Sequence, residues 1–276
     1  MPSLRQLLAS TLGCAAAVTA TGINDFSCQS DHNPVVLLHG LGATYYEDLN
    51  FLQYWLQKEG YCTYSQTYGA YDGFPFVGGL KPINESAPEI AAYIKEVTEK
   101  TGKDKVDLVG HSEGAFQSLY VPKFEGVAHL VDKIAAIAPP THATSFAGLY
   151  KLAYLFGNST REAVGDVLHA LGCGACDDLG LDGAAVERLN DGKPIVQEGN
   201  KVTIIASKYD ELVTPPTTSF VHEDGVQNWW IQDTCPFDPV GHIGEAYDLN
   251  VWNLVKNVLD ETPDRKFVCL IGSPGK

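Results

Sequence analysis

The sequence predicts an α/β fold in which a mostly parallel central sheet of about six strands is covered by helices on both faces. Short apolar runs bounded by proline or glycine recur along the chain, and helical patterns of apolar residues alternate with them. In addition, 45% of the 276 residues are hydrophobic and only 19% are charged. Such a chain is long and apolar enough to bury one large core.

The expected elements follow one another in a regular order. The apolar run PVVLLH at 34–39 predicts a strand buried on both faces, and leucines and a tryptophan at three- and four-residue spacing predict a helix over 47–60. Ser86 and Glu89 form a capping box, which predicts that the next helix begins there. Further strands are expected at 61–69, 105–110, 133–139, 201–207 and 227–232, and further helices at 86–102, 112–124 and 245–260.

The alternation of strands and helices stops between Pro140 and Lys201. About 60 residues without a clear strand are too many for an open connection. No repeat or low-complexity linker divides the chain. We therefore expect a helical cap insertion at about 141–200 within a single domain over 21–276.

The first residues show the pattern of a secretory signal peptide. Arg5 precedes an apolar stretch over 7–20, and the small residues Val18 and Ala20 suit signal peptidase. A buried or anchoring helix is the alternative, but the stretch is short and rich in alanine and threonine for a membrane span. We expect residues 1–20 to be removed and the mature chain to be secreted into the extracellular space.

The charge of the chain excludes some classes of partner. Its formal net charge of −15 repels a nucleic-acid backbone and an anionic membrane surface. No later segment contains the roughly 20 continuous apolar residues that a membrane helix needs. We expect no nucleic-acid partner and no membrane span.

Six cysteines remain once Cys14 is removed with the signal peptide. An even number in a secreted chain predicts three disulfides, and of the 15 possible pairings we prefer the one in sequence order. Cys173 and Cys176 form a C-x-x-C, which in another context would indicate a metal site; no second cysteine pair or histidine cluster completes a zinc set, so we expect no metal. The six are Cys28, Cys62, Cys173, Cys176, Cys235 and Cys269.

The stretch DLVGHSEGAF places Ser112 between Gly110 and Gly114, where a predicted strand ends and a predicted helix begins. A residue at such a turn takes a strained backbone conformation that lifts its side chain above the sheet, and side chains two positions away would collide with their surroundings. A serine that merely caps a helix is the alternative. The strand and helix on either side favour a nucleophile elbow, with Ser112 as the nucleophile.

A serine nucleophile needs a base and an acid, which follow it in the chain in this kind of fold. Asp210 comes directly after a predicted core strand and is the candidate acid; the adjacent Glu211 is its competitor and could simply be solvated. His242 lies in a glycine-flanked loop before the last helix and is the candidate base. His222 is the rival, but it precedes the last strand, where a surface histidine is the simpler interpretation.

Acyl transfer also requires backbone donors for the developing oxyanion, each worth about 3 kcal/mol of the barrier. One is the N–H of Glu113, which follows the nucleophile. We assign the other to Leu41, because the glycine-rich stretch HGLGAT follows the first buried strand. A plain turn at His39 and Gly40 is the alternative.

These motifs resemble the secreted class 2 triacylglycerol lipases and carboxylesterases of the α/β-hydrolase superfamily, over about residues 28–262. The resemblance implies an α/β-hydrolase fold, a Ser112, Asp210 and His242 triad, no metal or cofactor, and three sequential disulfides. The sequence departs from the family at Glu113, where many members carry Gln or Met; an acidic side chain would add negative charge near the oxyanion. The stretches that carry the resemblance are PVVLLHGLGAT, GHSEG, YDELVTP, GHIGEAYD and CGACDDLGLDGAAVERLN.

The resemblance implies hydrolysis of acyl esters such as triacylglycerols through an acyl-enzyme on Ser112, with a small-molecule or lipid ester as substrate and possible transient contact with a lipid interface. Polyester, lactone or amide substrates, or a binding module without catalysis, are the alternatives. The aromatic loop at 69–79 is expected to edge the cleft. Apolar side chains of the insertion could line an acyl pocket or pack in the core: Phe146, Leu149, Tyr150, Leu155 and Phe156.

Overall fold

The structure is a computed structural model that describes residues 23–145 and 172–272. The predicted signal peptide at 1–20 lies outside these residues. So do the apolar side chains of the insertion, Phe146, Leu149, Tyr150, Leu155 and Phe156.

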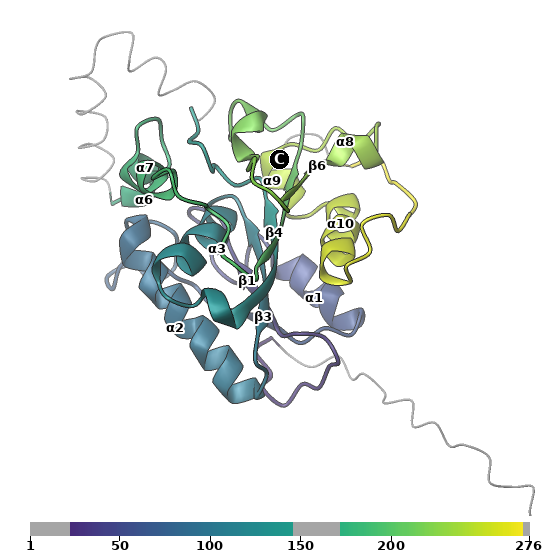
Figure 1. Cartoon of the computed structure of the whole chain (residues 1–276), viewed down its shortest axis with the longest axis horizontal. Helices are drawn as coiled ribbons and strands as arrows, with labels where there is room; N and C mark the ends of the chain where they lie inside the picture. The colour runs from purple at the N-terminus through teal and green to yellow at the C-terminus, as the bar shows by residue number, and fades with distance from the viewer. Residues whose placement is uncertain (1–22, 146–171, 273–276) are drawn as a thin grey trace, which may run out of the picture.

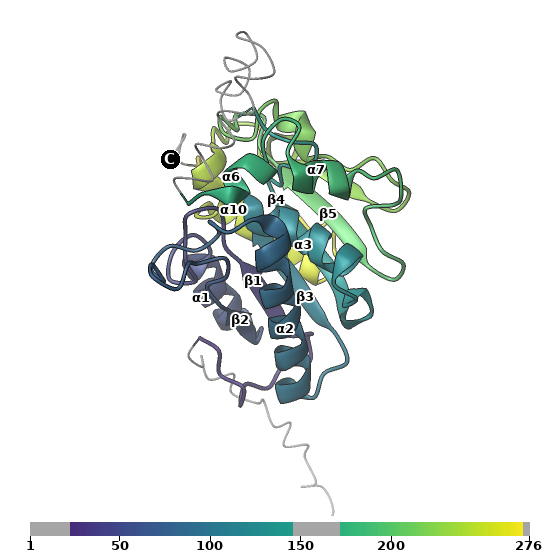
Figure 2. The same cartoon turned by 90° about the vertical axis from the view of Figure 1, so that its left-hand side faces the viewer.

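Six parallel strands form one central sheet in the order β2-β1-β3-β4-β5-β6 (Figures 1 and 2). The strands are β1 (Val35–Leu38), β2 (Thr63–Ser65), β3 (Val106–His111), β4 (Val131–Ile137), β5 (Lys201–Ala206) and β6 (Gln227–Trp230). The predicted, mostly parallel sheet of about six strands is confirmed. Because the strands are parallel, the loops that follow them gather at one edge, where ligands bind in open α/β sheets.

Helices cover both faces of the sheet, with α2 and α3 on one side and α1 and α10 on the other (Figures 1 and 2). Among the described helices, none combines the length and apolar character needed to cross a bilayer. The helices are α1 (Asn50–Lys58), α2 (Ile83–Thr101), α3 (Glu113–Phe124), α6 (Gly174–Asp178), α7 (Ala184–Leu189), α8 (Ile231–Thr234), α9 (His242–Glu245) and α10 (Leu249–Leu259), with the 3-10 turns η1 (Ala128–Leu130) and η2 (Pro216–Ser219).

Alternate residues of the central strands face two separate cores. Val36 and Leu38 of β1 pack in the core that includes α2 and α3, whereas Val35 and Leu37 pack in the core that includes α1 and α10. All four are fully buried or nearly so. A strand covered on both faces is apolar at every position, which explains the continuous apolar run in the sequence.

The predicted start of helix α2 is wrong. The helix begins at Ile83, so Ser86 lies inside it and its hydroxyl donates to backbone carbonyls of the same helix. Glu89 does not cap the helix; its carboxylate accepts the Gly69 N–H at 2.9 Å. The Ile83 N–H instead donates to Asp178 Oδ2 at 2.7 Å, so a carboxylate 95 residues away sets the helix start.

The described part of the expected cap, 141–145 and 172–200, contains the short helices α6 and α7. Residues 190–200 run mainly as turns and bends. Both short helices lie above the end of α2 in Figure 2. A helical cap over the whole of 141–200 stays a prediction, because 146–171 lie outside the described residues.

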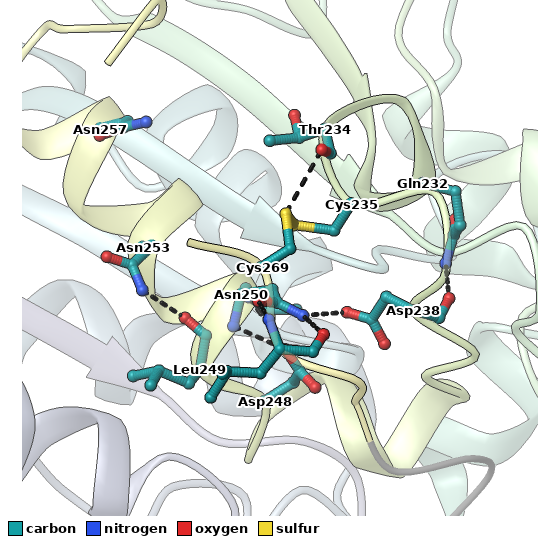
Figure 3. Close-up of a disulfide and its surroundings, with 12 residues drawn as sticks. Gln232, Thr234, Cys235, Asp238, Asp248, Leu249, Asn250, Asn253, Asn257 and Cys269 are labelled. Carbon is teal, nitrogen blue, oxygen red and sulfur yellow. Dashed lines mark hydrogen bonds between the residues drawn. A yellow bond between two sulfur atoms is a disulfide. The ribbon is translucent and has the colours of Figure 1, made fainter. Parts of the chain in front are cut away.

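Three disulfides pair the six cysteines in sequence order: Cys28–Cys62, Cys173–Cys176 and Cys235–Cys269. The last bond ties the C-terminal segment to the end of α8 (Figure 3). Beside it, the Asn250 side chain donates to Asp238 Oδ2 at 2.7 Å and to the Leu270 carbonyl at 2.8 Å. The segment after α10 is thereby fixed against the loop that leads to His242.

Candidate active site

Ser112 occupies the sharp turn between β3 and α3. Its φ of 54° lies in the left-handed region, which non-glycine residues adopt only under constraint. A Cβ at Gly110 would collide with the Gly114 backbone, and a Cβ at Gly114 would collide with the Leu38 carbonyl. The two glycines are therefore required by the close approach of backbone on both sides of the turn.

The structure brings Ser112, His242 and Asp210 together from three separate segments: Ser112 follows β3, Asp210 follows β5, and His242 begins α9. Ser112 Oγ lies 2.8 Å from His242 Nε2, and His242 Nδ1 lies 2.8 Å from Asp210 Oδ2. The second oxygen of Asp210 accepts the Leu212 and Val213 N–H groups at 2.9 and 2.8 Å. These donors orient the carboxylate, which in turn selects the histidine tautomer with a proton on Nδ1 and a free lone pair on Nε2.

The two rival residues lie elsewhere. Glu211 does not reach the His242 ring; its carboxylate accepts the His242 backbone N–H at 3.0 Å, so it is more than a solvated side chain. His222 is exposed and lies edge-on to Phe220. It lines a separate hollow of about 960 Å³ that contains none of Ser112, Asp210 and His242.

The two expected oxyanion donors are placed near the nucleophile. Leu41 lines the same cleft as Ser112, and Glu113 directly follows it. Within the described part of the chain, no hydrogen bond accounts for the N–H of either residue. The turn at Leu41 is braced because Gly42 donates to the Gly78 carbonyl at 3.0 Å and Gly78 donates to the Ala43 carbonyl at 2.8 Å.

The aromatic loop at 69–79 was expected to edge the cleft, but none of its residues lines the cleft around Ser112 within the described part of the chain. Phe74 and Phe76 are exposed, and they contact each other edge to face. The loop contacts the turn at Leu41 through the backbone of Gly78, which exchanges hydrogen bonds with Gly42 and Ala43.

The side chain of Glu113 corrects a second expectation. It is completely buried and its carboxyl packs against Gly79 and away from the cleft. Burial raises the pKa of this carboxyl well above its usual range, because a charge is costly in an apolar interior. The neutral acid is the favoured form, so the expectation of added negative charge beside the oxyanion is wrong.

A cleft of about 460 Å³ opens beside Ser112 and His242. Its size falls within the range of small-molecule sites. Most of its walls are apolar, and its polar lining consists of Glu47, Asp48, His111, Ser112, Thr144 and His242. The apolar lining consists of Leu41, Ala43, Pro140, Leu179, Leu212, Val213, Ile243 and Tyr247.

A second Asp–His pair borders the same cleft, and sequence reasoning missed it. His111 Nδ1 lies 2.7 Å from Asp48 Oδ1, and both side chains are buried. The only available signal was the histidine directly before Ser112 in the quoted motif. Nothing around Asp48 marked it as part of the site.

One group of side chains has the composition of a metal site. Ligand atoms of His111, His242 and Glu245 lie within 4.8 Å of one another. Each ring nitrogen of the two histidines, however, already takes part in a hydrogen bond. Burial also raises the pKa of Glu245 well above its usual range, which favours the neutral acid. The arrangement therefore suits a hydrogen-bonded site better than a metal ion.

Comparison with known proteins identifies relatives. A triacylglycerol lipase of Burkholderia plantarii is 29% identical over 143 residues, which are 51% of this chain and 38% of that protein. A triacylglycerol lipase of Pseudarthrobacter phenanthrenivorans is 32% identical over 117 residues, 41% of this chain and 35% of that protein. The chain thus matches little more than a third of the length of these curated relatives.

Solved structures share the fold at low identity. Lipase B of Aspergillus fumigatus superposes with a TM-score of 0.60 at 18% identity, over 87% of this chain and 58% of that one. The mature lipase BlEst2 of Bacillus licheniformis superposes with a TM-score of 0.56 at 15% identity, over 88% of this chain and 95% of that one.

The family model described as the alpha/beta hydrolase fold matches residues 33–173, about half of the chain. The matched residues include Leu41 and Ser112. The parallel sheet, the strained turn at Ser112 and this match agree. The chain belongs to the α/β-hydrolase fold family.

Proposed function

We propose that this protein is a secreted serine hydrolase that cleaves carboxylic esters, triacylglycerols among them. The observation that carries the proposal is the hydrogen-bonded row from Ser112 Oγ through His242 to Asp210 beside a largely apolar cleft. The relatives named as triacylglycerol lipases support the same class of reaction. The three disulfides and the leader pattern in the sequence support secretion.

The first half of the reaction forms an acyl-enzyme. His242 Nε2 takes the proton of Ser112 as its oxygen attacks the ester carbonyl, and Asp210 stabilises the imidazolium that forms. The N–H groups of Leu41 and Glu113 hold the oxyanion of the tetrahedral intermediate. The intermediate then collapses, and His242 gives its proton to the departing alcohol.

The second half repeats these steps with water. His242 takes a proton from water, the hydroxide oxygen attacks the acyl carbon, and the carboxylic acid leaves as Ser112 recovers its proton. Besides the ester itself, both halves use only the chain's own groups and one water molecule. The apolar cleft favours an acyl chain over a charged substrate.

Replacement of the nucleophile tests the proposal. We expect Ser112→Ala to lower the turnover of nitrophenyl esters by at least ~10³-fold while the far-UV circular dichroism stays unchanged. A fluorophosphonate probe should label the wild-type protein at residue 112 and leave the variant unlabelled. A chain-length series of esters, assayed below and above the concentration at which substrate aggregates, would separate lipase from esterase behaviour.

Three outcomes would count against the proposal. Retained turnover in Ser112→Ala would show that another group performs the reaction. Absence of both labelling and turnover in the wild-type protein would favour a binding module on the hydrolase fold. Faster cleavage of a matched anilide than of the ester would favour an amidase.

A further inference from the structure

Asp48 and His111 form a buried ion pair beside the proposed catalytic groups. We propose that this pair is a positioning dyad, which fixes both the oxyanion turn (the glycine-rich stretch 39–44, which carries the Leu41 N–H) and the backbone of His242 relative to Ser112. The proposal rests on the proposed esterase function, and it concerns two residues that the mechanism above does not use.

The pair connects two loops that are far apart in the chain. Asp48 Oδ2 accepts the Gly40 N–H at 2.6 Å, and Asp48 Oδ1 lies 2.7 Å from His111 Nδ1. On the other side of the ring, His111 Nε2 lies 2.9 Å from the His242 carbonyl oxygen. A continuous row of hydrogen bonds thus runs from the residue before Leu41 to the backbone of the proposed base.

The partners of His111 determine its protonation. The Asp48 carboxylate and the His242 carbonyl are both acceptors, so His111 donates from both ring nitrogens and is an imidazolium. Burial opposes this charge, but Asp48, the His242 carbonyl and the nearby Asp210 outweigh it and raise the pKa of His111. Glu245 faces the same space, and burial favours its neutral form.

The backbone of His242 is held from both sides. Its carbonyl accepts from His111, and its N–H donates to Glu211 at 3.0 Å. The rings of His111 and His242 lie 4.9 Å apart, so the dyad also limits movement of the base toward the cleft wall. These contacts fix the direction in which Nε2 of His242 points.

This precision matters because two parts of the site must agree in position during the reaction. The oxyanion turn and His242 act on the same substrate from two sides, and a displacement of about 1 Å of either one can lower the rate about 10²-fold. His111 precedes Ser112 in the chain, so the dyad is anchored at the elbow itself. The dyad thereby fixes the positions of the oxyanion turn and of His242 relative to Ser112.

Two variants of Asp48 separate hydrogen bonding from other roles. In Asp48→Asn, the amide oxygen can accept from Gly40 while the amide nitrogen donates to His111 Nδ1, which leaves a proton on Nε2 for the His242 carbonyl. In Asp48→Ala the row is broken. We expect kcat for a nitrophenyl ester to fall ~10²-fold in Asp48→Ala, with KM within about threefold, and to stay within about fivefold of wild type in Asp48→Asn.

Asp107→Ala is the matched control. Asp107 is also buried and also forms an ion pair, with Lys133 Nζ at 3.2 Å, but it lies at the opposite end of β3. Its loss should lower stability as the loss of Asp48 does, without changing kcat. The measured rates are divided by the folded fraction, which urea denaturation gives, so that a loss of stability alone does not change kcat per folded molecule.

The outcomes distinguish the two proposals. If wild-type protein turns over ester but Asp48→Ala keeps its kcat per folded molecule, the dyad proposal is wrong and the esterase proposal stands. An Asp48→Asn variant as slow as Asp48→Ala also overturns it, because the hydrogen-bond row would then not suffice. An inactive wild-type protein overturns both.

If Asp48→Ala does not fold, His111→Phe replaces it. This variant keeps a ring at the position, leaves the Asp48 bond to Gly40 and removes the donor to the His242 carbonyl. We expect the same loss in kcat with KM little changed. Full kcat in His111→Phe would contradict the proposal.

Discussion

Two Asp–His pairs flank Ser112, and they share the same carboxylate–Nδ1 hydrogen bond but differ in the partner of Nε2. In one, His242 binds Asp210 through Nδ1 and turns Nε2 toward the serine hydroxyl. In the other, His111 binds Asp48 through Nδ1 and turns Nε2 toward a backbone carbonyl. The carboxylate is the same in both pairs, and so is the ring nitrogen that meets it.

The partner of Nε2 decides what each histidine can do. A hydroxyl can give up a proton, so His242 needs a free lone pair on Nε2. A carbonyl only accepts, so His111 needs a proton there. A buried Asp–His pair beside a nucleophile therefore does not by itself identify the base.

Replacement of the aspartate by asparagine should lower kcat strongly in one pair and little in the other. In Asp210→Asn, an amide nitrogen facing Nδ1 of His242 forces the ring proton onto Nε2, which can then no longer accept the proton of Ser112. We expect kcat to fall by ~10⁴-fold in Asp210→Asn. This is the largest effect predicted for an acid of the site, and steady-state hydrolysis of a nitrophenyl ester measures it.

Asp48→Asn is the matched control for this prediction. In that variant the neutral His111 ring keeps its proton on Nε2, where the bond to the His242 carbonyl needs it. Thermal unfolding of both variants should show that each is folded under the assay conditions. Comparable kcat values in Asp210→Asn and Asp48→Asn would remove the distinction between the two pairs.

Local patterns in the sequence were sufficient for one of these pairs. Ser112 stands between glycines at a junction of strand and helix, and Asp210 and His242 follow predicted elements in the order that this fold uses. The apolar runs gave the strands for the same reason, because each strand buries both faces. Such signals extend over a few residues and need no knowledge of distant contacts.

The other pair depends on contacts that no local pattern contains. Asp48 lies 63 residues before His111, inside the stretch predicted as a helix over 47–60, whose spacing of apolar residues indicates which face is buried but names no partner for a carboxylate. The true start of α2 has the same origin, since Ile83 is capped by Asp178 from 95 residues away, which overrides the local capping box. Positions fixed by long-range hydrogen bonds require the structure.

A third buried carboxyl, that of Glu113, differs from those of Asp48 and Asp210 because no histidine among the described residues forms a hydrogen bond with it. Burial raises its pKa well above the usual range, so the folded protein keeps a proton that the unfolded chain releases above about pH 4.5. The free energy of unfolding therefore falls as the pH rises above that value, by up to ~1.4 kcal/mol per pH unit. Glu113→Gln removes this loss, so its stability relative to wild type should increase from pH 5 to pH 8.

Urea denaturation at each pH measures the effect of Glu113→Gln. Glu99→Gln is the control, because Glu99 is exposed on α2 and its replacement should not change the pH dependence. A constant difference between Glu113→Gln and wild type over this range would mean that Glu113 is ionised in the folded protein.

The smallest effect is expected at Glu211, which holds the His242 backbone from the side opposite to His111. Glu211 is exposed, so water can replace its bond to the His242 N–H, whereas no water replaces the buried bond from His111. We expect Glu211→Ala to lower kcat about two- to fivefold and Glu211→Gln to leave it within twofold, since the amide oxygen still accepts the N–H. The kcat values of both Glu211 variants, compared with that of Asp48→Ala, show which contact to the His242 backbone contributes more. If Glu211→Ala lost as much kcat as Asp48→Ala, burial would not determine how much each hydrogen bond contributes.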